Sequence, residues 1–360
     1  MNLPLGEPLV KASTSGTERE LELFFNALLE AYTNAAKQQG STVEHCFTVA
    51  GCSVRLLFAG PAMIPFITPS LNHLASRQVS TPLLTVCLFD SVSTGVELPT
   101  PPWSSKDYIF RGAIRGYGEG KIAVGFFPWS GILSMLDTSR NLAIHWIQDA
   151  RCCPLHETGS PLLMILHLWM ETQQRQLIHA GAVGTSNGGV LFAGKGGTGK
   201  STSAFACLNS ALSYLSDDYC LISSEPCPYG YSLYNSGKLD RVSASRFPHL
   251  PFEKARSPAT EKAVFFLDEL FPSRLVREFP IRAILLPEVT KNHHTSIEPV
   301  SQMAALRAVA PSTIFQIPGT GDQLLKDITA FVRKLPCYRL SLGSDIAQIP
   351  DAILNLLGTL

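Results

Sequence analysis

The sequence predicts an α/β protein organised around one nucleotide-binding loop. Residues Gly194 to Thr202 read Gly-Lys-Gly-Gly-Thr-Gly-Lys-Ser-Thr, which meets the phosphate-loop spacing G-x-x-x-x-G-K-[ST] in full. A short apolar run at 190–193 precedes the loop, and apolar residues recur at helical spacing from Ser201 to Leu212. A strand, a glycine loop and a helix therefore follow one another in the order that phosphate binding requires.

The loop residues have the chemistry to hold a polyphosphate. Glycines leave the backbone free to adopt positive φ and to approach a ligand closely, so successive N–H groups and the positive end of the next helix can face the phosphates. Lys200 is expected to reach the β and γ phosphates, and the Ser201 hydroxyl to bind the bridging Mg²⁺. The alternative is a glycine-rich turn that carries Gly-Lys-Ser by coincidence. The predicted ATP-binding set comprises Gly194, Lys195, Gly196, Gly197, Thr198, Gly199, Lys200, Ser201 and Thr202.

Composition and charge narrow the class of protein. The 360 residues are 45% apolar, which is ample for two buried cores. Lys plus Arg and Asp plus Glu both number 29, and this zero formal net charge argues against a nucleic-acid or anionic-membrane partner. The chain opens without a signal-peptide pattern, and its longest apolar run, Pro161 to Met170, is too short to span a bilayer. Since the nine cysteines form no Cys-x-x-Cys pair, we expect a soluble, cytoplasmic protein with reduced thiols.

Residues 1–157 are predicted to form a smaller α+β domain that is mostly β. Thr17 opens a capping box, and apolar residues then recur at helical spacing until Gly40. No catalytic constellation is found in this region, and its role is open. Alternating patterns and turn residues predict its remaining elements, which are hairpins at 43–58 (turning at Ala50 and Gly51), 114–127 and 131–147, and a strand at 83–89.

Residues 158–176 are predicted to form a connecting helix, since apolar residues run from Gly159 to Gln174, and residues 177–360 to form the nucleotide-binding domain. Four basic residues of this second part are candidates for contact with substrate or phosphate: Lys238, Lys262, Arg274 and Arg339. The pattern predicts strands at 177–183, 214–222, 281–286 and 337–342, and helices at 302–308, 323–333 and 345–357.

Asp217 and Asp218 lie inside the apolar run from Tyr214 to Ile222. Because two carboxylates are costly to bury unpaired, they are expected to face a cation. Beside a phosphate loop, one acid can hold Mg²⁺ and the other can take the proton of an attacking hydroxyl. The alternative is a turn-capping pair at the end of a strand.

Three motifs in order resemble those of the HPr kinase/phosphorylase family, whose P-loop core is shared with PEP carboxykinase. They are Ile178-His-Ala-Gly181, the glycine loop at 194–201 and Leu215-Ser-Asp-Asp218. The chain from about His179 onward is most similar to the HPr-kinase-related serine kinases of bacteria, including Asn235-Ser-Gly-Lys238 and the segment from Pro336 to Gly343. The resemblance implies a P-loop kinase core with a mixed sheet, as in the HPr kinase/PEP carboxykinase type.

The same resemblance implies roles for the site residues. His179 would sit near the catalytic acid, Asp217 would be the base, and Asp218 would join Ser201 at the metal, although the two aspartates could exchange roles. Lys200 would neutralise charge on the transferred phosphoryl group. The glycine- and arginine-containing segment with which HPr kinases bind their protein substrate is not found, so HPr as the acceptor and phosphorylase activity are left open.

The function predicted from these residues is an ATP-dependent kinase that transfers the γ-phosphoryl group to a hydroxyl. The expected acceptor is serine in a peptide, a protein or the free amino acid; no nucleic acid or membrane is expected, and a homo-oligomer is left open. The first alternative is a partition-type ATPase with a deviant Walker A motif, in which Lys195 would reach across a dimer. The second is a nucleotide site that regulates the N-terminal region.

Overall fold

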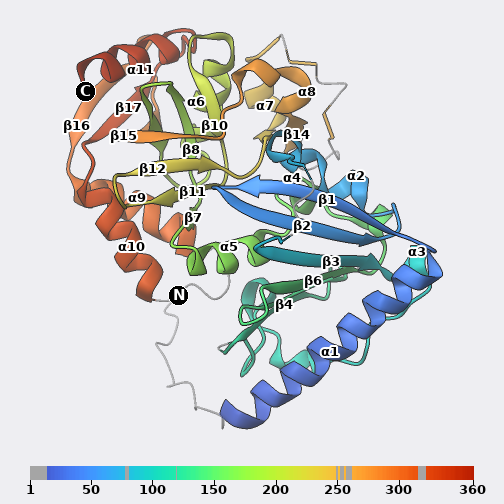
Figure 1. The fold of residues 1–360 in the computed structure, drawn as a ribbon. Coiled ribbons are helices and arrows are strands. Elements are labelled where there is room, and N and C mark those ends of the chain that lie inside the picture. The colour runs from blue at the N-terminus through green and yellow to red at the C-terminus, as the bar shows by residue number, and fades with distance from the viewer. Residues whose placement is uncertain are drawn as a thin grey trace.

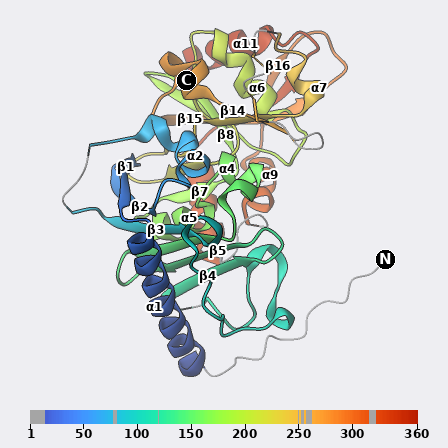
Figure 2. The ribbon, with the colours of Figure 1, turned by 90° about the vertical axis from the view of Figure 1, so that its right-hand side faces the viewer.

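The computed structural model describes residues 14–77, 81–118, 120–248, 250–251, 255–256, 262–314 and 322–360. It is a mixed α/β structure with two large mixed sheets and one two-stranded sheet. Figures 1 and 2 show the two large sheets as separate bodies with helix α5 (Leu163–Thr172) between them. No helix in the described ranges is long and apolar enough to cross a membrane. The division at residues 157 and 176 stays a prediction.

The first sheet has six strands in the order β1-β2-β3-β6-β5-β4. Its outer face is covered by helix α1 (Thr14–Gln38), whose Leu21, Phe25 and Leu28 are buried. The predicted periodicity of this helix is confirmed, but the helix begins before Thr17, so that residue does not cap it. The strands are β1 (Thr42–Val49), β2 (Cys52–Ala59), β3 (Leu84–Asp90), β4 (Ile122–Phe127), β5 (Ile132–Asp137) and β6 (Leu142–Ile147).

Two of the three predicted hairpins are confirmed. Strands β1 and β2 pair antiparallel around Ala50 (φ 48°) and Gly51 (φ 80°), the left-handed pair that a tight hairpin turn needs. Strands β5 and β6 pair around residues 138–141. The hairpin predicted at 114–127 is wrong, because only β4 is a strand there and it pairs with β5, whereas Ile114 forms an isolated bridge with Tyr108.

The second sheet is centred on the long strand β15 (Glu278–Val289). Strands β9 (Gly188–Phe192) and β17 (Cys337–Leu342) run parallel to it, and β12 (Tyr229–Ser232) runs antiparallel. The other strands of this sheet are β7 (Gln176–Ile178), β8 (Gly181–Thr185), β10 (Ser213–Ser216), β11 (Cys220–Ser223) and β16 (Ser296–Val300). The two-stranded sheet pairs β13 (Ser236–Leu239) with β14 (Ala263–Phe266).

Helices cover both faces of the second sheet. Successive residues of a strand point to opposite faces, so neighbouring residues of β9 contact different helices. Phe192 of β9 packs with α6 (Lys200–Ala206) and α11 (Gln348–Thr359). Its neighbour Leu191 packs with α9 (Gln302–Ile314) and α10 (Asp322–Arg333). The helices predicted at 201–212, 302–308 and 345–357 correspond to α6, α9 and α11 with shifted ends.

The connecting helix is interrupted. The structure has α4 (Leu155–Gly159), a break at 160–162, and then α5. Pro161 lacks the N–H that a continuing helix would use, and Leu162 adopts a left-handed conformation with φ 58°. The prediction of one helix over 158–176 is therefore wrong in its bounds, and the break leaves Ser160 outside both helices.

A seam of hydrogen bonds ties residues 232–236 to the N-terminal region. His73 Nε2 lies 2.7 Å from Ser232 Oγ, and Asn235 donates from its backbone N–H to Ser70 O at 2.8 Å. The Tyr234 hydroxyl donates to Pro161 O at 2.8 Å. One apolar cluster also runs from strands of the first sheet through α5 to Leu221 and Leu233.

Candidate active site

The site forms where two neighbouring strands are interrupted together. The strand predicted at 177–183 is β7 and β8, separated at His179 and Ala180, and the strand predicted at 214–222 is β10 and β11, separated at 217–219. Strand β7 pairs with β11, whereas β8 pairs with β10. The two interruptions therefore lie opposite each other, and both strand predictions were wrong in missing them.

Gly181 allows the close approach at this point. A Cβ atom placed there would lie 3.3 Å from both the Asp217 Cα and the Ser216 carbonyl oxygen. This distance is shorter than an ordinary van der Waals contact, and both atoms belong to the backbone. The glycine of the His-Ala-Gly motif thus lets the aspartate segment approach closely, and a Cβ there would require that backbone to shift by a few tenths of an ångström.

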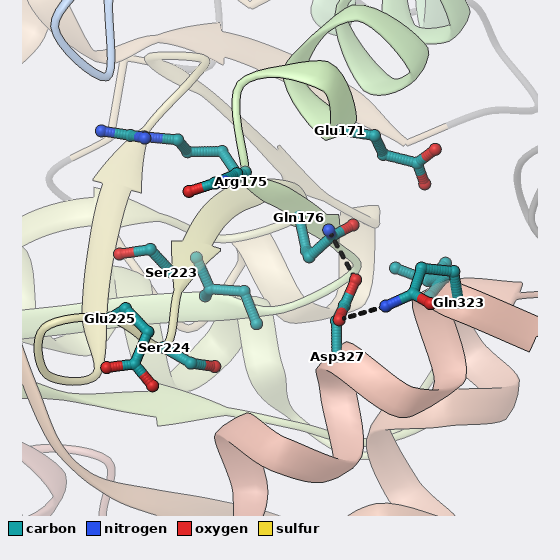
Figure 3. Close-up of a pocket in the computed structure, with 11 residues that line it drawn as sticks. Glu171, Arg175, Gln176, Ser223, Ser224, Glu225, Gln323 and Asp327 are labelled. Atoms are coloured by element: carbon teal, nitrogen blue, oxygen red, sulfur yellow. Dashed lines mark hydrogen bonds between the residues drawn. The ribbon is translucent and has the colours of Figure 1, made fainter.

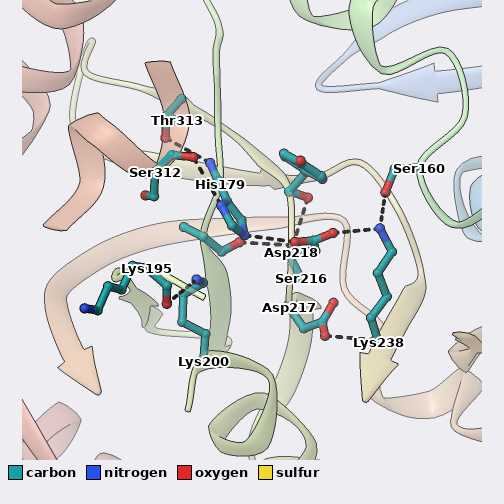
Figure 4. Close-up of polar contacts among 12 residues, drawn as sticks. Ser160, His179, Lys195, Lys200, Ser216, Asp217, Asp218, Lys238, Ser312 and Thr313 are labelled. Atoms are coloured by element: carbon teal, nitrogen blue, oxygen red, sulfur yellow. Dashed lines mark hydrogen bonds and ion pairs between the residues drawn. The ribbon is translucent and has the colours of Figure 1, made fainter. Parts of the chain in front are cut away.

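A chain of polar contacts is centred on Asp218 (Figure 4). Its Oδ1 lies 3.0 Å from His179 Nε2, and its Oδ2 accepts from Lys238 Nζ at 2.7 Å. Lys238 Nζ also donates to Ser160 Oγ at 2.8 Å. Burial opposes ionisation of Asp218, but the Lys238 ammonium and the His179 ring outweigh it and hold the pKa of this carboxyl well below its ordinary value.

His179 has a hydrogen-bond acceptor at each ring nitrogen. Its Nδ1 lies 3.2 Å from the Ser312 carbonyl oxygen, which can only accept, and its Nε2 faces the ionised Asp218. The two acceptors therefore fix the orientation of the ring beside Asp218. The His179 backbone N–H donates to Thr313 Oγ1 at 3.1 Å, which fixes the chain at the interruption.

Asp217 has a different environment. Its Oδ2 accepts from the Lys238 backbone N–H at 3.0 Å, while its Oδ1 is buried without a hydrogen-bond partner in the described part of the chain. Burial and the neighbouring Asp218 charge raise the pKa of Asp217 to about 6. The Ser201 side chain lies close enough to this carboxylate to favour its ionised form. An orphaned buried carboxylate oxygen beside a hydroxyl is suited to a cation.

The glycine loop joins β9 to α6, as the sequence predicts. Gly194 and Gly199 have φ of 154° and 106°, which would strain any other residue. An added Cβ would also lie 2.7 Å from Thr198 Oγ1 and 2.3 Å from Leu342 Cδ1 respectively. Gly196 and Gly197 face open space, where an added Cβ would meet nothing within 4 Å. The exposed side of the loop is therefore free to receive a ligand close to its backbone.

Lys200 projects back into the loop from the first turn of α6. Its Nζ donates to Gly194 O at 2.6 Å, and the side chain is buried. Burial lowers the pKa of Lys200, while Asp218 and Asp217 act in the opposite direction, so both acids are near enough to influence it. Ser201 and Thr202 follow in the same turn, and Thr202 is buried. The exposed Lys195 points away from the cluster in Figure 4.

Two of the other basic residues predicted to contact substrate or phosphate, Arg339 and Lys262, are exposed or about half exposed. Arg339 pairs with Glu288 at 3.3 Å, and both side chains are about half exposed or more. Lys262 is exposed, although its charge lowers the pKa of Lys200 after the larger effect of burial. Ser160, Ser312 and Thr313 were missed at the sequence level, because isolated hydroxyl residues far from the motifs carry no signal of their tertiary placement.

The protein has a cavity beside the Asp218 cluster and another cavity away from it. One of about 200 Å³ adjoins the cluster and is lined by Tyr219, Lys238 and Ser160 together with residues of the first sheet. The other, of about 480 Å³, lies between α5, β7, β11 and α10 (Figure 3). Gln176 donates to Asp327 there at 2.8 Å, and none of its lining residues belongs to the Asp218 cluster.

The residues near the glycine loop offer few oxygen ligands for a metal ion. Within the described ranges, no group of three or more His, Cys, Asp or Glu side chains could hold a metal ion. Ser201 and Asp217 supply one hydroxyl and one carboxylate oxygen, which fits Mg²⁺ because this ion usually keeps several waters and takes its other oxygens from substrate phosphates.

Comparison with solved structures gives a distant likeness. No family model matches the chain, and no curated protein matches it. Among solved structures, the chain is similar to the HPr(Ser) kinase/phosphatase from Coxiella burnetii at 13% identity and a TM-score of 0.27, over 51% of this chain and 97% of that chain. A likeness this distant says nothing about activity, substrate or partner.

Proposed function

We propose that this protein is an ATP-dependent kinase that transfers the γ-phosphoryl group to a hydroxyl. The observation that carries the proposal is the convergence of the glycine loop with the aspartate pair. Lys200 and Ser201, at the start of α6, both interact electrostatically with Asp217, and the Asp218 cluster adjoins them. Phosphoryl transfer depends chiefly on positioning and charge neutralisation, which these groups supply.

The division of labour between the aspartates follows from their partners. Both oxygens of Asp218 already have partners, His179 and Lys238, and the Lys238 ammonium would repel a metal ion there. Asp217 has the unpartnered oxygen and the Ser201 neighbour. We therefore assign Asp217 to the metal side and Asp218 to the acceptor side, the reverse of the assignment favoured by the family resemblance.

Asp218 then accepts the proton of the attacking hydroxyl. A carboxylate held ionised by the Lys238 ammonium and by its contact with His179 is a weak base, but a loose transition state needs little proton transfer before the phosphoryl group has largely moved. His179 fixes the carboxylate through Oδ1, and Lys238 fixes it through Oδ2. When bound, Mg²⁺ would neutralise charge on the phosphates.

Three variants test this proposal. Lys200→Ala should abolish transfer from [γ-³²P]ATP, whereas Asp217→Asn should raise the Mg²⁺ concentration needed for half-maximal rate. Asp218→Asn should lower turnover severely even at saturating Mg²⁺, with nucleotide binding largely intact. Mass spectrometry of candidate acceptors measures the product. Undiminished transfer by Lys200→Ala would exclude a phosphate-loop mechanism, and equal Mg²⁺ dependence in both aspartate variants would exclude the assignment.

A further inference from the structure

The cavity of about 200 Å³ lies on the acceptor side of the cluster. Lys238 and Ser160 line it, and Figure 4 shows both on one side of Asp218 while Lys200 lies on the other. Tyr219, the residue after Asp218, also lines it. A molecule in this cavity would therefore reach Asp218 from the direction opposite to the glycine loop.

The first sheet supplies much of the cavity wall. Phe127 at the end of β4, Ser130 in the following turn and Ser134 on β5 all face it. The wall is thus shared between the two large sheets, with the Asp218 cluster at their junction. A ligand in this cavity would therefore contact the N-terminal region as well as the Asp218 cluster.

Arg111 also lines the cavity and is held in an unusual backbone conformation. Its φ of 60° and ψ of 41° are left-handed, which costs a non-glycine residue about 1 kcal/mol or more. Strained residues cluster at active sites and ligand clamps as well as in turns, and this one lines a cavity beside the Asp218 cluster. Burial and then the Asp218 charge raise the pKa of Tyr219, and the Arg111 charge opposes this, as expected of two residues that line one cavity.

The charge of the cavity favours an anionic ligand. Arg111 and Lys238 are the cations among the described lining residues, and Glu157 is the acid. Asp218 offsets the charge of Lys238, so the Arg111 charge is the one that attracts an anion here. Burial raises the pKa of Glu157 to about 7, against the opposing effects of the Leu162 N–H and of Lys238, so its negative charge is reduced near neutral pH. A carboxylate would pair with the Arg111 guanidinium in a two-pronged hydrogen bond.

We propose that this cavity binds the phosphoryl acceptor, a free hydroxy acid of about amino-acid size, with its carboxylate at Arg111 and its hydroxyl toward Asp218. The inference rests on the proposed kinase function. A volume of about 200 Å³ is below the range of drug-sized pockets and suits one small molecule better than a folded protein segment.

The chemical step balances without a further reactant. The acceptor hydroxyl oxygen forms a bond to the γ-phosphorus of ATP, and the bond from that phosphorus to the β–γ bridging oxygen breaks. ADP leaves with the bonding electron pair, and the hydroxyl proton passes to the Asp218 carboxylate.

The test uses the full chain with Mg²⁺ and ATP and a matched set of probes. L-Serine, L-threonine and D-glycerate carry a carboxylate, serinamide and glycerol do not, and a serine-containing peptide represents the macromolecular acceptor. Phosphorus NMR and mass spectrometry measure products, and ligand-observed NMR measures binding without turnover. We expect at least one of the three acids to bind and be phosphorylated, and the neutral probes to be used at least tenfold less well.

Variants connect that preference to the cavity. Arg111→Gln should raise the KM for the acid at least tenfold with the KM for ATP within twofold, and Arg111→Lys should recover part of the loss. Ser130→Phe should block acceptor binding by filling the space. Arg115→Gln is the control, because Arg115 is exposed and does not line the cavity.

The outcomes separate the two proposals. Phosphorylation of the peptide but of none of the acids, or an unchanged acceptor KM in Arg111→Gln, would overturn the cavity assignment while leaving the kinase function. Failure to transfer phosphate to any probe, together with no ATP binding, would overturn the kinase function. If no probe is phosphorylated and ATP does not bind, ligand-observed NMR still tests the cavity. The cavity assignment is then overturned if none of the three acids binds, or if Arg111→Gln does not weaken their binding.

Discussion

Removal of the Lys238 ammonium should destabilise the fold far more than removal of an equally close surface ammonium. Lys238 Nζ lies 2.7 Å from Asp218 Oδ2, with 14% and 23% of the two side chains exposed. Lys334 Nζ lies at the same distance, 2.7 Å, from Glu225 Oε1, but those side chains are 37% and 80% exposed. The pairs match in separation and differ in burial, so Lys238→Met and Lys334→Met isolate the effect of environment.

The magnitude follows from the charge left behind. At an effective dielectric of about 20, the attraction across 2.7 Å is about 6 kcal/mol, but the desolvation of Lys238 offsets much of it. Asp218 would keep His179 as a partner, so the loss should fall below the 3–5 kcal/mol that is typical of a fully stranded buried charge. We expect Lys238→Met to lower the free energy of unfolding by about 2–3 kcal/mol and Lys334→Met by at most about 0.5 kcal/mol.

Urea denaturation at pH 7, followed by circular dichroism, measures both variants against the unmodified chain. Repeating it at about 1 M salt should reduce the small Lys334 effect further and leave most of the Lys238 effect, since buried pairs are less screened. Equal losses for the two variants, or a Lys238→Met protein as stable as the parent, would refute the reasoning.

Three further predictions concern acid stability, the loop and the glycine contact. Burial lowers the pKa of His145 to about 3 from about 6.5 when unfolded, so the unfolded state binds more protons between these values. Stability should therefore fall on acidification below pH 6.5, by up to about 1.4 kcal/mol per pH unit, and His145→Gln, but not the exposed His293→Gln, should flatten this slope in urea titrations. Lys195→Ala should change transfer from ATP less than about threefold in a radiometric assay, because its side chain is exposed and points away from the cluster; complete loss would instead favour the dimeric switch. Gly181→Ala should lower stability by about 1–3 kcal/mol in thermal unfolding through contact with the aspartate backbone, whereas Gly358→Ala, with open space around it, should not; equal stability would contradict the packing argument.

The sequence predicted those parts of the fold that depend on local pattern. The periodicity of α1, the turn at Ala50 and Gly51, and the strand-loop-helix order around Lys200 are all encoded within a few neighbouring residues. The interruptions at His179 and at Asp217 were not predicted, because the apolar runs continue through both. A strand ends there only because the chain changes its pairing partner, and pairing between distant segments is invisible to local periodicity.

In the candidate site, too, the residues could be predicted from local motifs, whereas their tertiary partners could not. The motifs pointed to His179, Lys200, Asp217 and Asp218, and the structure brings these residues into one region. The partners of each carboxylate could not be predicted, because adjacent aspartates have identical local chemistry. Only the tertiary position of Lys238, which bonds Asp218 through its side chain and Asp217 through its backbone, distinguishes them.

The hydrogen bonds that join residues 232–236 to Ser70, His73 and Pro161 limit how this chain could be shortened. A protein expressed from residue 177 onward would keep the glycine loop and both aspartates, yet Asn235 and Tyr234 would lose acceptors that water would have to replace. The segment leading directly into Lys238 would then be anchored at one end alone, and its ammonium would lose Ser160 as well. An isolated C-terminal half should therefore retain affinity for nucleotide more readily than it retains the ability to modify a second molecule.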